Sequence, residues 1–140
     1  MMNYGCEGLN VVISGGTSGI GLATAEKFLR DGANVYILGR SVLRGALAVQ
    51  KLLAKTERTA VYIPCDVTSV EECRKAVASI GGAIHILVNA AGVYMEQRLE
   101  NVTEADIADI FDTNVKGTML LTQASLPFMY GGGSIVNVAS

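Results

Sequence analysis

The amino-acid sequence predicts a doubly wound α/β fold, in which helices cover both faces of a parallel sheet. Apolar runs of strand length alternate with segments of helical periodicity along the whole chain. Most of these apolar runs are continuous, as is typical of strands that are buried on both faces. Half of the 140 residues are apolar and 17% are charged, which is the composition of a packed globular domain.

Five strands and four helical regions are expected in alternating order. The strands are predicted at residues 9–14, 34–38, 59–64, 84–88 and 134–138. The helices are predicted at residues 20–32, 41–55, 68–80 and 103–130, the last one broken or kinked around residues 113–114. Ser41 is a candidate N-cap of the second helix, and Thr68 with Glu71 has the spacing of a capping box for the third.

Composition narrows the classes of function. A formal charge of −2 and an isoelectric point near 5.3 provide no basic patch for nucleic acid. The sequence has neither a signal-peptide pattern nor an apolar run of membrane-spanning length. Its three cysteines lack metal-ligand spacing, so free thiols in a reducing compartment, by default the cytoplasm, are expected. No repeat or linker interrupts residues 1–140, which predicts one domain.

A glycine-rich turn after the first strand is the strongest motif for a ligand. Such a turn between a strand and a helix presents backbone N–H groups and the positive end of the helix dipole, which together suit a phosphate. The spacing GxxxGxG is also compatible with an ordinary connection, but its place after the first strand favours a dinucleotide cofactor. The candidate cofactor-binding residues here are Gly15, Thr17, Ser18, Gly19, Ile20 and Gly21.

The end of the second strand indicates which dinucleotide is bound. An acidic residue there would bind a ribose 2′-hydroxyl and favour NAD, whereas an arginine can bind the 2′-phosphate of NADP. Gly39 occupies that position, and Arg40 and Ser41 follow it. Arg40 could also be an ordinary solvated arginine. The sequence nevertheless favours NADP, with Arg40 and Ser41 as ligands of the phosphate.

Two further strand ends carry candidate cofactor contacts. Asp66 and Val67 follow the third strand and could bind and cover an adenine ring, although Asp66 could equally be a loop or cap residue. After the fourth strand come Asn89, Ala90, Ala91 and Gly92, whose small side chains allow the backbone to approach a ligand closely. For Asn89, a hydrogen bond to a neighbouring strand is at least as good an interpretation as contact with the cofactor.

The combination resembles the short-chain dehydrogenase/reductase family, whose single-domain members have a Rossmann-type fold. The matching segments, in family order and spacing, are residues 14–21, 65–67, 89–92, 114 and 134–140. The resemblance implies hydride transfer between NAD(P)H and a small carbonyl or alcohol substrate, with NADP as the preferred cofactor and NAD less favoured, and a homo-oligomeric full-length protein. It assigns catalytic roles to Asn114, as the anchor of a proton-relay water, and to Ser140, as a hydrogen-bond partner of the substrate oxygen.

The chain departs from the family pattern at its end. The family's Tyr-x-x-x-Lys pair follows the catalytic serine, whereas this sequence stops at Ser140 and none of its five tyrosines has a lysine four residues on. The expected domain is therefore truncated after the fifth strand, and the 140-residue chain is expected to be inactive. The alternatives are a non-catalytic dinucleotide-binding or regulatory protein and a non-functional gene fragment. Another departure, His85, is expected to be a half-buried polar residue without a catalytic role.

Overall fold

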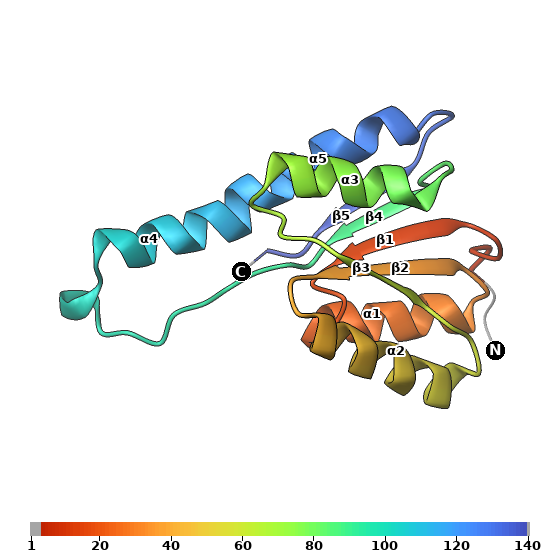
Figure 1. The fold of residues 1–140 in the computed structure, drawn as a ribbon, viewed down its shortest axis with the longest axis horizontal. Helices are drawn as coiled ribbons and strands as arrows, with labels where there is room; N and C mark the ends of the chain where they lie inside the picture. Colours follow the sequence, from red (N-terminus) through yellow and green to blue (C-terminus); the bar gives the residue numbers. More distant parts are fainter. Residues whose placement is uncertain (1–3, 140) are drawn as a thin grey trace.

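One parallel sheet forms the centre of the molecule in a computed structural model that describes residues 4–139 (Figure 1). Its strand order is β3-β2-β1-β4-β5, and every pair of neighbours is parallel. The strands are β1 Asn10–Ser14, β2 Asn34–Gly39, β3 Val61–Pro64, β4 Ile86–Asn89 and β5 Ser134–Asn137. The doubly wound, Rossmann-type fold predicted from the sequence is confirmed.

Helices cover both faces of the sheet. In Figure 1, α1 and α2 lie below the sheet and α3 and α5 lie above it, while α4 projects to the left beyond the strands. The helices are α1 Gly19–Arg30, α2 Val42–Thr56, α3 Val70–Ile80, α4 Glu104–Phe111 and α5 Thr118–Ser125. Short helical turns add η1 Leu99–Asn101 and η3 Leu126–Phe128, and a π-helical segment, η2 Asp112–Gly117, joins α4 to α5.

The central strand β1 divides its side chains between two cores. Val11 and Ile13 pack with α1 and α2, whereas Val12 packs with α3 and α5, and all three are fully buried. This alternation follows from the pleat, which directs successive side chains to opposite faces. Because both faces are apolar cores, β1 reads as a continuous run of apolar residues in the sequence.

The start of α3 differs from the predicted capping box of Thr68 and Glu71. Ser69 is the N-cap, and its hydroxyl accepts a hydrogen bond from the N–H of Glu72 at 3.2 Å. Thr68 instead donates its N–H and its hydroxyl to Asp66 Oδ1, at 3.0 and 2.8 Å. The prediction was wrong by one residue because Asp66 binds Thr68 in a local turn, a competing use of the same polar side chains.

The predicted break in the last helix takes the form of the π-helical segment η2, which contains Thr113 and Asn114. The helix begins as expected, with reciprocal hydrogen bonds between Thr103 and Asp106. Gly117 ends the π segment against the loop after β3, where a β-carbon on Gly117 would lie only 2.6 Å from a methyl group of Val67. The irregular segment therefore lies against the loop that follows β3.

One side of the α4–α5 region is apolar and exposed. Four apolar side chains on this side are 47–67% exposed to solvent: Ile107, Phe111, Val115 and Met119. Every residue of the edge strand β5 is exposed as well. Among residues 4–139, no helix has both the length and the apolar character needed to cross a membrane.

Two leucines on different helices test this layered arrangement. Leu121 of α5 is fully buried, whereas 72% of Leu43 of α2 is exposed. We expect Leu121→Ala to lower the free energy of unfolding by about 2–5 kcal/mol, because it leaves a cavity between α5 and the sheet. The control Leu43→Ala should change it by about 0.5 kcal/mol or less. Urea unfolding measures both values, and equal losses would contradict the packing of α5 on the sheet.

Candidate functional site

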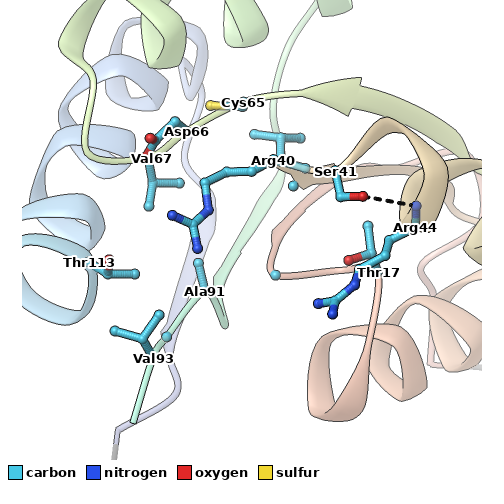
Figure 2. Close-up of a pocket in the computed structure, with 14 residues that line it drawn as sticks. Thr17, Arg40, Ser41, Arg44, Cys65, Asp66, Val67, Ala91, Val93 and Thr113 are labelled. Carbon is cyan, nitrogen blue, oxygen red and sulfur yellow. Dashed lines mark hydrogen bonds between the residues drawn. The ribbon is translucent and has the colours of Figure 1, made fainter. Parts of the chain in front are cut away.

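A pocket of about 220 Å³ lies at the carboxyl ends of the strands, where the loops after β1, β2, β3 and β4 meet (Figure 2). In open α/β sheets, ligands bind at this edge. The predicted cofactor residues that line it are Gly15, Thr17, Arg40, Ser41, Asp66, Val67, Ala91 and Gly92. The structure thus brings together candidates from four separate segments of the sequence.

The glycine turn approaches its neighbours too closely for larger residues. Gly15 has a φ of +64°, and a β-carbon there would lie 2.6 Å from the carbonyl oxygen of Ala90. A β-carbon on Gly21 would collide with the carbonyl of Gly15. These two glycines therefore allow the turn to lie against both the first turn of α1 and the loop after β4.

The start of α1 lies beside the pocket and remains available to a ligand. Ser18 is the N-cap, but its hydroxyl makes no capping hydrogen bond within the described chain. The first N–H groups of a helix lack intrahelical partners, and the helix dipole is positive at this end. Ser18, Gly19 and Ile20 are all exposed here. This end of α1 therefore offers N–H groups to an anion, and the pyrophosphate at this place stays a prediction.

Ser14 connects the glycine turn to the loop after β4. Its hydroxyl oxygen accepts hydrogen bonds from the N–H groups of Ala90 and Ala91, both at 3.1 Å. The side chain is 1% exposed, so the bonds are protected from water. Ser14 therefore positions the backbone of Ala90 and Ala91 along one side of the pocket.

The end of β2 is fixed by a residue that the sequence analysis did not identify. The carbonyl oxygen of Gly39 accepts hydrogen bonds from the hydroxyl of Tyr62 at 2.7 Å and from the N–H of Cys65 at 3.0 Å. The Tyr62 ring lies against Gly45 of α2, where a β-carbon would be 2.5 Å from the ring. Tyr62 has no sequence signal for this role, since its partner is a backbone carbonyl on another strand.

Two arginines lie on opposite sides of the pocket. In Figure 2, the side chain of Arg40 points toward Val67, Ala91 and Thr113, whereas the guanidinium of Arg44 lies beside Thr17. Ser41 caps α2 as predicted, because its hydroxyl accepts a hydrogen bond from the N–H of Arg44 at 3.2 Å. Arg44 was not among the predicted site residues, although a second basic residue one helical turn after Arg40 was visible in the sequence.

Asp66 is the acidic group among the described residues that line the pocket. Its burial raises the pKa of the carboxyl group, but hydrogen bonds from the N–H and hydroxyl of Thr68, together with the positive charges of Arg40 and Lys116, lower the pKa below its ordinary value. Asp66 is therefore ionised at neutral pH and partly balances the charge of Arg40. One of its oxygens is occupied by Thr68, so the other is the one available to a ligand.

Six of the predicted cofactor residues do not line the pocket, namely Ser18, Gly19, Ile20, Gly21, Asn89 and Ala90, and among them Asn89 bonds to neighbouring elements. Its side chain is 2% exposed and donates hydrogen bonds to Thr122 at 3.1 Å and to Asn137 at 2.9 Å. These partners belong to α5 and β5, and Asn89 is not among the residues that line the pocket. The interpretation of Asn89 as a link between neighbouring strands therefore fits this geometry better than contact with a cofactor.

Asn114 is the predicted catalytic residue that lies within the described part of the chain. Asn114 lies in η2, where its side chain accepts a hydrogen bond from the N–H of Val93 at 2.8 Å and donates one to the carbonyl of Val93 at 2.9 Å. This pair of bonds fixes the loop that continues from Gly92, and the adjacent Thr113 lines the pocket. Ser140 lies outside the described residues.

His85 is half-buried, as expected, and makes a structural hydrogen bond. Its Nδ1 accepts a hydrogen bond from the N–H of Asn10 at 2.9 Å, and the side chain is partly buried. This bond connects the start of β1 to the residue before β4, at the opposite end of the strands from the pocket. His85 therefore contributes to the sheet rather than to the site.

Comparisons with known proteins identify the family of this chain. A family profile described as short chain dehydrogenase matches residues 9–140. The chain is 36% identical over 137 residues to an uncharacterized oxidoreductase of Methylorubrum extorquens, covering 96% of this chain and 55% of that protein. It is 35% identical over 136 residues to D-xylose 1-dehydrogenase of Caulobacter vibrioides, covering 96% and 54% of the two chains.

Solved structures show the same architecture. The crystal structure of L-sorbose reductase from Gluconobacter frateurii, complexed with NADPH and L-sorbose, has a TM-score of 0.89 and 31% sequence identity, and the match covers 99% of this chain and 55% of that one. The chain thus spans about half the length of the relatives that it matches. On the evidence of this family match, the fold and the strand-end motifs, the chain belongs to the short-chain dehydrogenase/reductase family.

Proposed function

We propose that this chain is the cofactor-binding part of an NADP-preferring oxidoreductase that transfers a hydride between the cofactor and a small carbonyl or alcohol substrate. The observation that carries the preference is the pair of arginines after β2, where the residue at the strand end is Gly39 and offers no carboxylate. NADP(H) would supply or accept the hydride, and the residues of this chain would bind and orient it.

The residues at the pocket fit such a cofactor. The turn of residues 15–21 and the start of α1 would hold the pyrophosphate, since the turn is rich in glycine and the first N–H groups of a helix lack intrahelical partners. Asp66 and Val67 would contact the adenine, and the backbone of Ala91 and Gly92 would lie along the cofactor. The NADPH found in the related L-sorbose reductase supports this class of cofactor.

The catalytic groups are proposed from the family resemblance. Asn114 would anchor a proton-relay water and Ser140 would hydrogen-bond the substrate oxygen. No Tyr-x-x-x-Lys occurs among the 140 residues, so we assign no general acid to them. We therefore expect these 140 residues alone to turn over no substrate. Cofactor binding is the step that the chain can perform on its own.

We also propose that the longer protein is a homo-oligomer and that it works in a reducing compartment such as the cytoplasm. The exposed apolar side chains of α4 and α5 support the first, since apolar patches of this kind mark contact surfaces. The three free cysteines support the second. A second candidate function is a dinucleotide-binding protein without catalysis, because the pocket at the strand ends supports cofactor binding by itself. This candidate predicts the same cofactor as the first. It differs in predicting that a longer form of the protein would also lack reductase activity.

Removal of the arginines tests the cofactor preference. We expect Arg40→Ala and Arg44→Ala each to weaken binding of NADPH by roughly tenfold or more, since a hydrogen bond to a charged group contributes about 1.5–3 kcal/mol. Binding of NADH should change little. Arg98→Ala is the matched control, because Arg98 is exposed and, within residues 4–139, pairs with the exposed Glu100 at 3.6 Å. Calorimetric titration gives the affinities, and equal affinities of the unaltered chain for NADPH and NADH would refute the preference.

A carboxylate at the end of β2 should reverse the preference. A β-carbon on Gly39 would lie 3.1 Å from a methyl group of Thr17, so Thr17 must be shortened at the same time. We expect the double variant Gly39→Asp, Thr17→Ala to bind NADH more tightly than NADPH, because the new carboxylate accepts from a 2′-hydroxyl and repels a 2′-phosphate. The variant Gly39→Asn, Thr17→Ala is the neutral control. If both variants retained the same preference for NADPH, the placement of the ribose at Gly39 would be wrong.

A further inference from the structure

Tyr62 of β3 contacts the chain beside both arginines of the pocket. Its hydroxyl donates a hydrogen bond of 2.7 Å to the carbonyl oxygen of Gly39, the residue before Arg40. Its ring lies against Gly45 of α2, the residue after Arg44. In Figure 2, the two arginines extend to opposite sides of the pocket. A single side chain that does not itself line the pocket therefore contacts the backbone next to each of them.

The hydrogen bond to Gly39 fixes the peptide group that leads into Arg40. The carbonyl of Gly39 and the N–H of Arg40 belong to one planar unit, so neither can turn without the other. The same carbonyl oxygen accepts a second hydrogen bond, from the N–H of Cys65 at 3.0 Å, and both of its lone pairs are then used. The direction in which the chain enters Arg40 is therefore set by Tyr62 and Cys65.

Arg40 depends on this support because its own side-chain contacts are few. The residue is exposed, and it forms no salt bridge within residues 4–139. Gly39 adds conformational freedom, since a glycine restricts the backbone less than any other residue. Without a contact from outside the strand, the end of β2 would leave Arg40 in many orientations.

The ring of Tyr62 supports the start of α2. A β-carbon on Gly45 would lie 2.5 Å from the ring, so α2 approaches β3 as closely as a glycine allows. The ring also packs against the core on the α1–α2 side of the sheet. Arg44 precedes Gly45 and donates its N–H to Ser41, the N-cap of α2. The position of the first turn of α2, and with it the position of Arg44, therefore depends on this ring contact.

The Tyr62 hydroxyl is a donor at neutral pH. Partial burial raises the pKa of this hydroxyl above its ordinary value, and the neighbouring Cys65 acts in the same direction. A raised pKa keeps the proton on the oxygen, and a phenolate could not donate to a carbonyl. The hydrogen bond to Gly39 therefore persists through neutral and mildly alkaline pH.

We propose that Tyr62 is a positioning residue for the 2′-phosphate of the cofactor, because it holds Arg40 and Arg44 where they can reach this group. The identity of the cofactor rests on the function proposed above. Tyr62 acts through the backbone of Gly39 and Gly45 and not by touching the ligand. Loss of its hydroxyl should weaken the binding of NADP⁺ and change the binding of NAD⁺ much less, since the two dinucleotides differ only in the 2′-phosphate.

The variant Tyr62→Phe removes the hydroxyl and keeps the ring against Gly45. Calorimetric titration with NADP⁺ and with NAD⁺ measures both affinities, and urea unfolding shows whether the variant is folded. We expect the affinity for NADP⁺ to fall roughly three- to tenfold, the usual range for one hydrogen bond, and the affinity for NAD⁺ to change about twofold or less. The control Tyr36→Phe removes the hydroxyl of a half-buried tyrosine of β2 that does not line the pocket, and it should leave both affinities unchanged.

A double-variant cycle shows whether the effect of the hydroxyl passes through Arg40. We expect Tyr62→Phe to cost little further affinity for NADP⁺ when it is added to Arg40→Ala, because the peptide that the hydroxyl fixes then carries no guanidinium. A merely structural role would give additive losses and would lower the affinity for NAD⁺ as much as that for NADP⁺. Either of these two results would overturn the role of Tyr62.

Gly45→Ala reaches the same contact from α2 and decides the matter if Tyr62→Phe does not fold. Its β-carbon would displace the ring, and the hydroxyl with it, so the ratio of the NADP⁺ affinity to the NAD⁺ affinity should fall here too. If the unaltered chain prefers NADP⁺ and the folded variants keep its ratio of affinities, the role of Tyr62 is overturned and the proposed function is left intact. Equal affinities of the unaltered chain for the two dinucleotides, or binding of neither, would overturn the proposed function and this inference with it.

Discussion

The hydroxyl of Ser14 and the two glycines beside it determine how closely the central strands can bring their loops together. Ser14 accepts hydrogen bonds from Ala90 and Ala91 across the gap between β1 and β4. This approach is possible only because Gly15 and Gly21 leave no side chain between the turn, α1 and the loop after β4. Everything else at the site is arranged around this junction, since the pocket opens along it and the residues after β2 and β3 form its other side.

The strand order explains why residues so distant in sequence share one pocket. β1 lies at the centre, with β2 and β3 on one side and β4 and β5 on the other. All five strands run in the same direction, so their loops emerge at the same edge. The side of β2 and β3 carries the charged groups Arg40, Arg44 and Asp66, whereas the side of β4 offers small residues and backbone. A polar, anionic ligand therefore fits between the charged side chains after β2 and β3 and the small residues after β4.

Sequence alone predicted the strands and eight of the residues that line the pocket, because both depend on local patterns. Apolar runs locate the strands, and glycine spacing locates the turn. It failed at Thr68, a polar side chain with two possible partners, which binds Asp66 instead of capping α3. Tyr62 could not be found because its partner, the carbonyl of Gly39, becomes adjacent only when the sheet forms. Such pairings are long-range, and no spacing in the sequence encodes them.

A crystal structure of this chain with NADP⁺ would show directly whether the strand ends form a site for this cofactor. We expect the pyrophosphate at residues 15–21 and the start of α1, and the adenine on Asp66 and Val67. The 2′-phosphate should lie within hydrogen-bond distance of Arg40 or Arg44. A 2′-phosphate that contacts neither arginine, or a cofactor bound away from the strand ends, would contradict it.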